Sequence, residues 1–140
     1  MKRTYKNIIF ILFCSILIFS SCRDKDYPDI PYVNIDRYLY INSMDYIPVG
    51  GYKYINDGYR GLIVYRIMNN EFSVFERCCP HDPEKSTARV SVEESGVICV
   101  DTTCGSRFNL VDGGKIEGPS IYPLKMYRNS FDGNVLHIYN

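Results

Sequence analysis

Residues able to bind a metal are concentrated in two short groups in the middle of the 140-residue chain. The first group, residues 78–81, reads Cys-Cys-Pro-His, and the second, residues 99–104, reads Cys-Val-Asp-Thr-Thr-Cys. Thiolate, imidazole and carboxylate groups are common zinc ligands, and thiolates and imidazoles also hold iron-sulfur clusters. Because each group lies at the end of an expected strand, two facing loops can hold a metal centre between them.

The elements that must position these groups are β-strands. From Tyr32 onward the chain is rich in Tyr, Ile and Val and is interrupted by Gly, Asn or Asp, which is typical of an all-β domain. We expect strands at residues 32–41, 61–68, 71–77, 88–93, 97–100, 107–110, 121–128 and 135–139. Turns are expected at residues 69–70, 94–96, 112–114 and 132–134, which offer residues that tolerate positive φ. The expected fold is a small antiparallel barrel or pair of stacked sheets.

The N-terminus predicts export. Three basic residues between positions 2 and 6 precede an apolar run, residues 8–19, which is broken only by Cys14 and Ser15 and is too short to span a bilayer comfortably. The run ends in Phe-Ser-Ser before Cys22, a sequence similar to the site at which bacterial signal peptidases cut before a lipidated cysteine. We expect a signal sequence at residues 1–21, a lipid on Cys22, a flexible linker at residues 22–31 and one domain at residues 32–140. An uncleaved signal anchor is the alternative, and both place the domain in the cell envelope, on the periplasmic or surface side of a bacterial membrane.

Charge and histidine content exclude two classes of function. The 16 basic residues are balanced by 16 acidic ones, so the basic excess that nucleic-acid binding requires is absent from the sequence. The two histidines, His81 and His137, each lack a nearby nucleophile and orienting acid in the sequence, which argues against a Ser-His-Asp hydrolase. We therefore do not expect hydrolase chemistry. Because the sequence is sized for one domain, it leaves no room for a separate catalytic domain, and we do not expect the chain to be an enzyme by itself.

Around the two groups the sequence resembles the Rieske [2Fe-2S] domains and their envelope-lipoprotein relatives. Residues 79–81, Cys-Pro-His, match the first ligand box of that family, Cys-x-His. Residues 104–110, Cys-Gly-Ser-Arg-Phe-Asn-Leu, are similar to the end of the second box, which usually reads Cys-Pro-x-His-Gly-Ser-x-Phe or Tyr. Residues 118–120, Gly-Pro-Ser, look like the family's proline loop. The resemblance covers residues 32–140 and implies a Rieske-like fold with two cluster-type loops.

The second box departs from the family at two ligand positions. With Gly105 aligned, Cys104 stands where the second histidine is expected, and Asp101 stands where the second-box cysteine is expected. The ligands that the resemblance implies are Cys79, His81, Asp101 and Cys104, with Cys99 replacing Asp101 if the loop shifts its register. Ser106 and Pro119 would then support the cluster from outside the ligand set.

Three outcomes remain open for this site. A [2Fe-2S] cluster on these ligands would have a lower potential than a Rieske centre, because a thiolate replaces a neutral imidazole. A zinc ion on Cys79, His81, Cys104 and either Cys99 or Asp101 would be structural. Without a metal, oxidising conditions would favour disulfides, such as Cys79 with Cys104 or Cys78 with Cys99.

The sequence thus predicts a membrane-tethered Rieske-like protein with one of two functions. The first is single-electron transfer at the envelope through a [2Fe-2S] cluster, to a redox partner that the sequence does not identify. The second is a structural or interaction role for a cluster-free domain that is cross-linked by disulfides or binds zinc.

Overall fold

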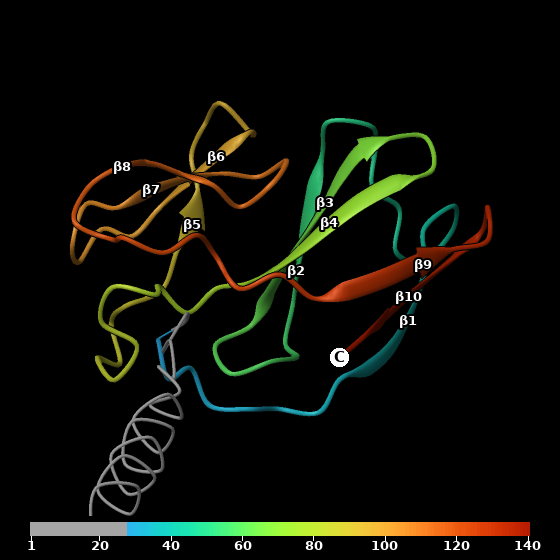
Figure 1. Cartoon of the computed structure of the whole chain (residues 1–140). Coiled ribbons are helices and arrows are strands. Elements are labelled where there is room, and N and C mark those ends of the chain that lie inside the picture. The colour runs from blue at the N-terminus through green and yellow to red at the C-terminus, as the bar shows by residue number, and fades with distance from the viewer. Residues whose placement is uncertain (1–27) are drawn as a thin grey trace, which may run out of the picture.

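Residues 28–140 are described by a computed structural model, and over this range the chain is all β (Figure 1). The strands in this range are β1 (Asp36–Tyr40), β2 (Tyr52–Ile55), β3 (Leu62–Met68), β4 (Glu71–Glu76), β5 (Ser91–Val92), β6 (Ile98–Val100), β7 (Arg107–Asn109), β8 (Lys115–Glu117), β9 (Arg128–Phe131) and β10 (Val135–Tyr139). They form antiparallel sheets ordered β1-β10-β9, β2-β3-β4 and β5-β6-β7-β8. The expectation of a small antiparallel all-β domain is confirmed.

The two three-stranded sheets form one half of the domain, and the four-stranded sheet forms the other (Figure 1). Within the first half, the Tyr127 N–H donates to the Val74 carbonyl at 2.8 Å, and Phe75 forms an isolated bridge with Met126. The chain entering β9 therefore runs along the edge of β4. The sheets of this half are joined by backbone hydrogen bonds as well as by packing.

The apolar sequence of β3 is explained by burial on both faces. Leu62 and Val64 pack in a core shared with β1 and β10, whereas Ile63 and Tyr65 pack in a second core shared with the four-stranded sheet. A strand that is covered on both faces has an almost continuous apolar sequence rather than an alternating one. β3 therefore contributes to both halves of the domain.

Seven of the eight expected strands are present within their expected ranges. The prediction of a strand at residues 121–128 is wrong. In this segment the described chain has only the isolated bridge at Met126, and β9 begins at Arg128. Pro123 lies in this segment and lacks the N–H that a strand interior requires. Two short strands, β2 and β8, were not expected.

Three of the four expected turns place a glycine at positive φ. These glycines are Gly96, Gly113 and Gly133, with φ values of 73°, 74° and 101°. The turn at residues 69–70 joins β3 to β4 without such a residue, since no non-glycine residue between 28 and 140 has positive φ.

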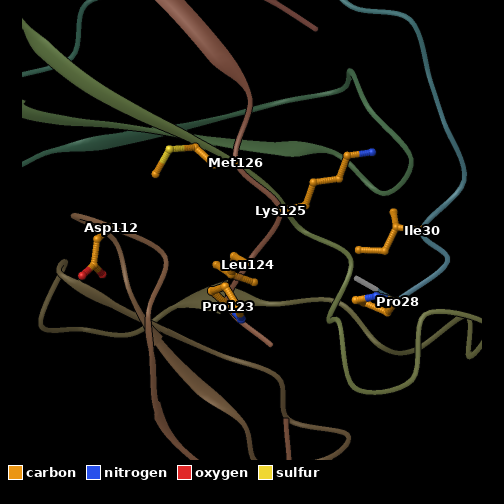
Figure 2. A pocket seen from close by; sticks show the side chains of 7 residues that line it. All are labelled: Pro28, Ile30, Asp112, Pro123, Leu124, Lys125 and Met126. Carbon is orange, nitrogen blue, oxygen red and sulfur yellow. The ribbon is translucent and has the colours of Figure 1, made fainter. Parts of the chain in front are cut away.

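The expected signal sequence, the expected lipid site at Cys22 and the first part of the linker fall in residues 1–27, outside the described residues. They remain predictions. No helix within residues 28–140 is long and apolar enough to cross a membrane. The described chain begins against the domain, where Ile30 is buried and, together with Pro28, faces residues 123–126 across a pocket of about 520 Å³ (Figure 2).

Candidate metal centre

The first loop of the candidate site follows β4 directly. Cys78 pairs with Arg89 in an isolated bridge, and the Cys79 N–H donates to the Ala88 carbonyl at 3.1 Å. These bonds close residues 80–87 into a loop and place Cys79 at its base. The Cys79 side chain is fully buried in the second core.

The second loop joins β6 to β7 in a tight turn. The Asp101 N–H donates to the Ser106 carbonyl at 2.9 Å, and the Gly105 N–H donates to the Asp101 carbonyl at 2.7 Å. Gly105 has a φ of 79°, which this turn requires and which a side chain would disfavour. The turn holds the Asp101 carboxyl inside the domain, where the Thr103 N–H donates to its Oδ1 at 2.9 Å.

The two loops bring three donor atoms together. Cys79 Sγ lies 3.7 Å from Cys104 Sγ, and Cys104 Sγ lies 3.3 Å from Asp101 Oδ2. The ligand atoms of all three residues lie within 4.8 Å of one another. Cys79 and Asp101 are fully buried, whereas Cys104 is partly exposed. Burial raises the pKa of the Cys79 thiol, so its thiolate needs a compensating positive charge at neutral pH.

A third loop covers the second one. Ser106 Oγ lies 3.1 Å from Cys104 Sγ and accepts a hydrogen bond from the Ser120 N–H at 3.1 Å. Gly118 makes this close approach possible, because a Cβ there would lie 2.5 Å from the Ser106 Cα. Ser106 thus links the Cys104 sulfur to the loop at residues 118–120, which also contains Pro119.

His81 and Cys99 are not part of this three-donor group. His81 is exposed, 3.9 Å from Asp82 Oδ2, and borders a small pocket of about 200 Å³ with Pro119 and Ile121. Cys99 is buried in β6, opposite Phe108, and burial raises the pKa of its thiol to about 12. Of the two alternatives for the fourth cluster ligand, the structure therefore places Asp101 at the site and Cys99 in the core.

All four cysteines between residues 28 and 140 are free thiols in the structure. Cys78 Sγ contacts the carbonyl oxygens of Cys79 and Pro83, at 3.9 and 3.7 Å. The disulfide expected as an alternative between Cys78 and Cys99 is thus absent from the structure. Cys79 and Cys104 form the thiol pair that is in contact.

Two residues that support the first loop were missed in the sequence. Glu76 is fully buried at the end of β4, and Oε1 of its carboxylate accepts hydrogen bonds from the Arg60 and Cys78 N–H groups. Arg60 donates from its guanidinium to the carbonyls of Pro83 and Ser86, within the loop that carries His81. The sequence did contain a signal for the burial of Glu76. Its position in the alternation of the strand places it on the same face as the apolar residues Phe72 and Val74.

The fold of these residues is that of a Rieske-like domain, and solved structures support this class. One is a complex of reduced oxygenase and oxidized ferredoxin in carbazole 1,9a-dioxygenase, with 22% identity and a TM-score of 0.50 over 72% of this chain and 92% of the other. Another is the ferredoxin of carbazole 1,9a-dioxygenase from Nocardioides aromaticivorans IC177, with 15% identity and a TM-score of 0.51 over 77% of this chain and 98% of the other. No protein-family model and no curated protein sequence matches the chain. At these identities the likeness establishes the fold, and the chemistry depends on the donors present.

The donors do not match the [2Fe-2S] centre that this fold implies. A Rieske centre binds one iron with two cysteines and the other with two histidines. Here the residue at the second histidine position is Cys104, and its short side chain reaches inward to Cys79 and Asp101. The only histidine near the site, His81, lies outside the group within the described chain. Three donors therefore surround one point, which suits a single ion better than two irons.

Proposed function

We propose that this chain is a lipid-anchored envelope protein whose Rieske-like domain binds one zinc ion between its two loops and serves as a metal-stabilised structural or interaction module. The observation that carries the proposal is the convergence of Cys79, Asp101 and Cys104 within 4.8 Å. Thiolates and a carboxylate form a mixed set that zinc accepts.

The separation of the two sulfurs supports a single tetrahedral ion. Two thiolates bound to zinc at about 2.3 Å lie about 3.8 Å apart when the coordination is tetrahedral. Cys79 Sγ and Cys104 Sγ are already 3.7 Å apart. His81, two residues after Cys79, is the candidate for the fourth ligand, and a water molecule is the alternative.

A zinc ion at this point would join the first loop to the second and supply the positive charge that the buried Cys79 thiolate needs. Ser106, which lies 3.1 Å from Cys104 Sγ, would donate its hydroxyl hydrogen to the bound thiolate and so orient it. Because the ion would bind the folded loops only, it would add to stability by about 4 kcal/mol when free zinc is a thousandfold above its dissociation constant.

Electron transfer is the second candidate function, and the fold favours it. The solved neighbours include ferredoxins of a dioxygenase. On this interpretation a [2Fe-2S] cluster held by Cys79, His81, Asp101 and Cys104 would carry single electrons. The loops would have to separate to hold it, because the present spacing brings three of these donors to one point.

Metal analysis of the full chain separates these two functions. The protein is extracted from membranes under anaerobic conditions, and its iron, zinc and acid-labile sulfide contents and its visible spectrum are measured. We expect one zinc per chain, no sulfide and no visible bands. Two irons and two sulfides per chain would overturn the zinc proposal in favour of electron transfer, and a protein that takes up neither metal would overturn both.

Two matched variants test the ligand assignment. Cys104→Ala should lower zinc affinity at least a hundredfold, because it removes one of two thiolate ligands. Cys99→Ala removes a thiol from the core beside the site and should leave zinc affinity within about threefold of the wild type. Equal losses in the two variants would contradict the assignment.

The membrane tether depends on Cys22, which lies outside the described residues. Labelled fatty acid should be incorporated into the wild type and not into Cys22→Ala, and the mature wild type should lack residues 1–21, because cleavage is proposed to follow lipidation of this cysteine. A wild-type protein that keeps residues 1–21 and takes up no fatty acid would favour an uncleaved signal anchor.

A further inference from the structure

We propose that Cys79 and Cys104 form a reversible disulfide that replaces the bound ion, so that oxidation controls the metal site. This inference rests on the proposed function, since it concerns the same three donors. It follows from the contact between the two thiols, from their unequal exposure and from the places of the other two cysteines.

The two thiols already touch. Cys79 Sγ and Cys104 Sγ lie 3.7 Å apart, and a disulfide bond requires about 2.05 Å. Side-chain rotation at Cys104 can supply much of the missing approach, because this residue lies in a turn and is partly exposed. The resulting bond would join the same two loops that the metal joins.

The unequal exposure of the thiols sets the order of the reaction. Cys79 is fully buried, so an external oxidant meets the Cys104 sulfur first. With a low-molecular-weight disulfide as the oxidant, the Cys104 thiolate attacks one of its sulfurs and releases one thiol, which leaves a mixed disulfide on Cys104. The Cys79 thiolate then attacks Cys104 Sγ and releases the second thiol.

The metal leaves because the disulfide consumes two of its three donors. In total, the zinc dithiolate, one external disulfide and two protons give the protein disulfide, two external thiols and free zinc. Two electrons pass from the protein sulfurs to the external disulfide. The donors left are the Asp101 carboxylate, which still accepts the Thr103 N–H, and the fourth ligand, His81 or water, and without thiolates this pair is too weak a site to retain zinc.

The other two cysteines are poorly placed to compete. Cys78 Sγ is fully buried against the carbonyls of Cys79 and Pro83, and Cys99 is fully buried in β6. Within residues 28–140, Cys79 and Cys104 are the one pair of thiols in hydrogen-bonding contact. The oxidation should therefore be specific for this pair.

Zinc release during controlled oxidation tests the inference. The zinc-loaded full chain is treated with oxidised glutathione and then with dithiothreitol, while a chromogenic chelator reports free zinc and mass spectrometry of peptides reports disulfides. We expect one zinc released for every two thiols lost, a peptide pair that joins Cys79 to Cys104, and restored zinc binding after reduction. The double variant Cys78→Ala/Cys99→Ala should respond in the same way.

Failure of this inference is distinguishable from failure of the proposed function. If the protein binds zinc but oxidation leaves the ion in place, or joins Cys78 to Cys99, the redox inference is overturned and the metal site stands. If the reduced protein never binds zinc, the proposed function fails, and with it control of the metal. Peptide mapping of the oxidised protein then reports only on the contact between the two thiols.

Discussion

At the scale of single residues, the identity of position 104 decides the geometry of the site. A histidine at this position would place its ring nitrogens farther from the backbone than the sulfur of a cysteine. The shorter Cys104 side chain instead ends 3.7 Å from Cys79 Sγ and 3.3 Å from Asp101 Oδ2. The short thiol side chain at position 104 thus lies beside the other two donors, at one point.

The buried carboxylate of Glu76 yields a prediction about stability. Its Oε1 accepts the Arg60 and Cys78 N–H groups, and its Oε2 accepts the Tyr59 N–H and the Tyr127 hydroxyl. Glu76→Gln replaces one carboxylate oxygen by an amide N–H₂, so at least one backbone N–H loses its acceptor, and we expect the free energy of unfolding to fall by about 3 kcal/mol. Urea denaturation of the wild type and the variant measures this difference in the free energy of unfolding.

The control is Glu71→Gln, which changes an exposed glutamate at the other end of β4. This substitution should alter the free energy of unfolding by less than about 0.5 kcal/mol. A similar loss in both variants would show that the hydrogen bonds of Glu76 contribute little.

At the scale of elements, three loops build the site. They are residues 80–87 after β4, residues 101–106 between β6 and β7, and residues 118–120 after β8. The β6–β7 register pairs Cys99 with Phe108 and Val100 with Arg107. Asp101 therefore falls at the first position of the turn, and Cys99 remains inside the strand. This register, and not the identity of the residues alone, selects the carboxylate over the thiol.

The close contact at Gly118 predicts that loop packing controls metal affinity. A Cβ at Gly118 would lie 2.5 Å from the Ser106 Cα, and its φ of 92° already disfavours a side chain. Gly118→Ala should displace the loop from Ser106, lower the free energy of unfolding by about 2 kcal/mol and reduce zinc affinity at least tenfold. Thermal unfolding and zinc titration measure the two effects.

Gly133→Ala is the matched control for this variant. Gly133 has a similar φ of 101°, but a Cβ there would meet nothing within 4 Å. Gly133→Ala should therefore lower the free energy of unfolding only by the backbone cost, about 1 kcal/mol, and should bind zinc like the wild type. Equal zinc affinities in the two alanine variants would contradict the role given to the loop.

Local patterns predicted most of the strands, and long-range contacts account for what they missed. The alternation of β10 and the turn at residues 132–134 depend on neighbouring residues, so the sequence was enough to find them. The segment before β9 instead follows the edge of β4, where Met126 forms a bridge with Phe75 and the Tyr127 N–H donates to the Val74 carbonyl, and both partners are remote in the sequence. The contact of Gly118 with Ser106 is of the same kind.

The candidate site was predictable to a similar extent. The resemblance picked out Cys79, Asp101 and Cys104, which the structure brings together. The exposed position of His81 depends on how the loop at residues 80–87 folds, and no short sequence pattern encodes it. The burial of Glu76 likewise depends on donors from residues 59 and 60 and from Tyr127.

At the scale of the whole molecule, the described chain begins close to the first loop. A pocket of about 460 Å³ lies between this start of the chain and the first loop, and it is lined by Pro28, Asp29, Pro31, Tyr59, Pro83 and Glu84. The segment from the proposed lipid site at Cys22 to Pro28 spans at most about 22 Å when extended. The proposed tether would therefore hold the metal loops near the membrane surface, where envelope oxidants and partner proteins can reach Cys104.

The central claim is that one ion is held by Cys79, Asp101 and Cys104. X-ray absorption at the metal edge of the anaerobically purified full chain tests it most directly, because it counts the sulfur and the lighter ligands around the metal. We predict zinc with two sulfur ligands at about 2.3 Å, two nitrogen or oxygen ligands at about 2.0–2.1 Å, and no neighbouring metal. An iron edge with a second iron close by, or zinc without sulfur ligands, would contradict the claim.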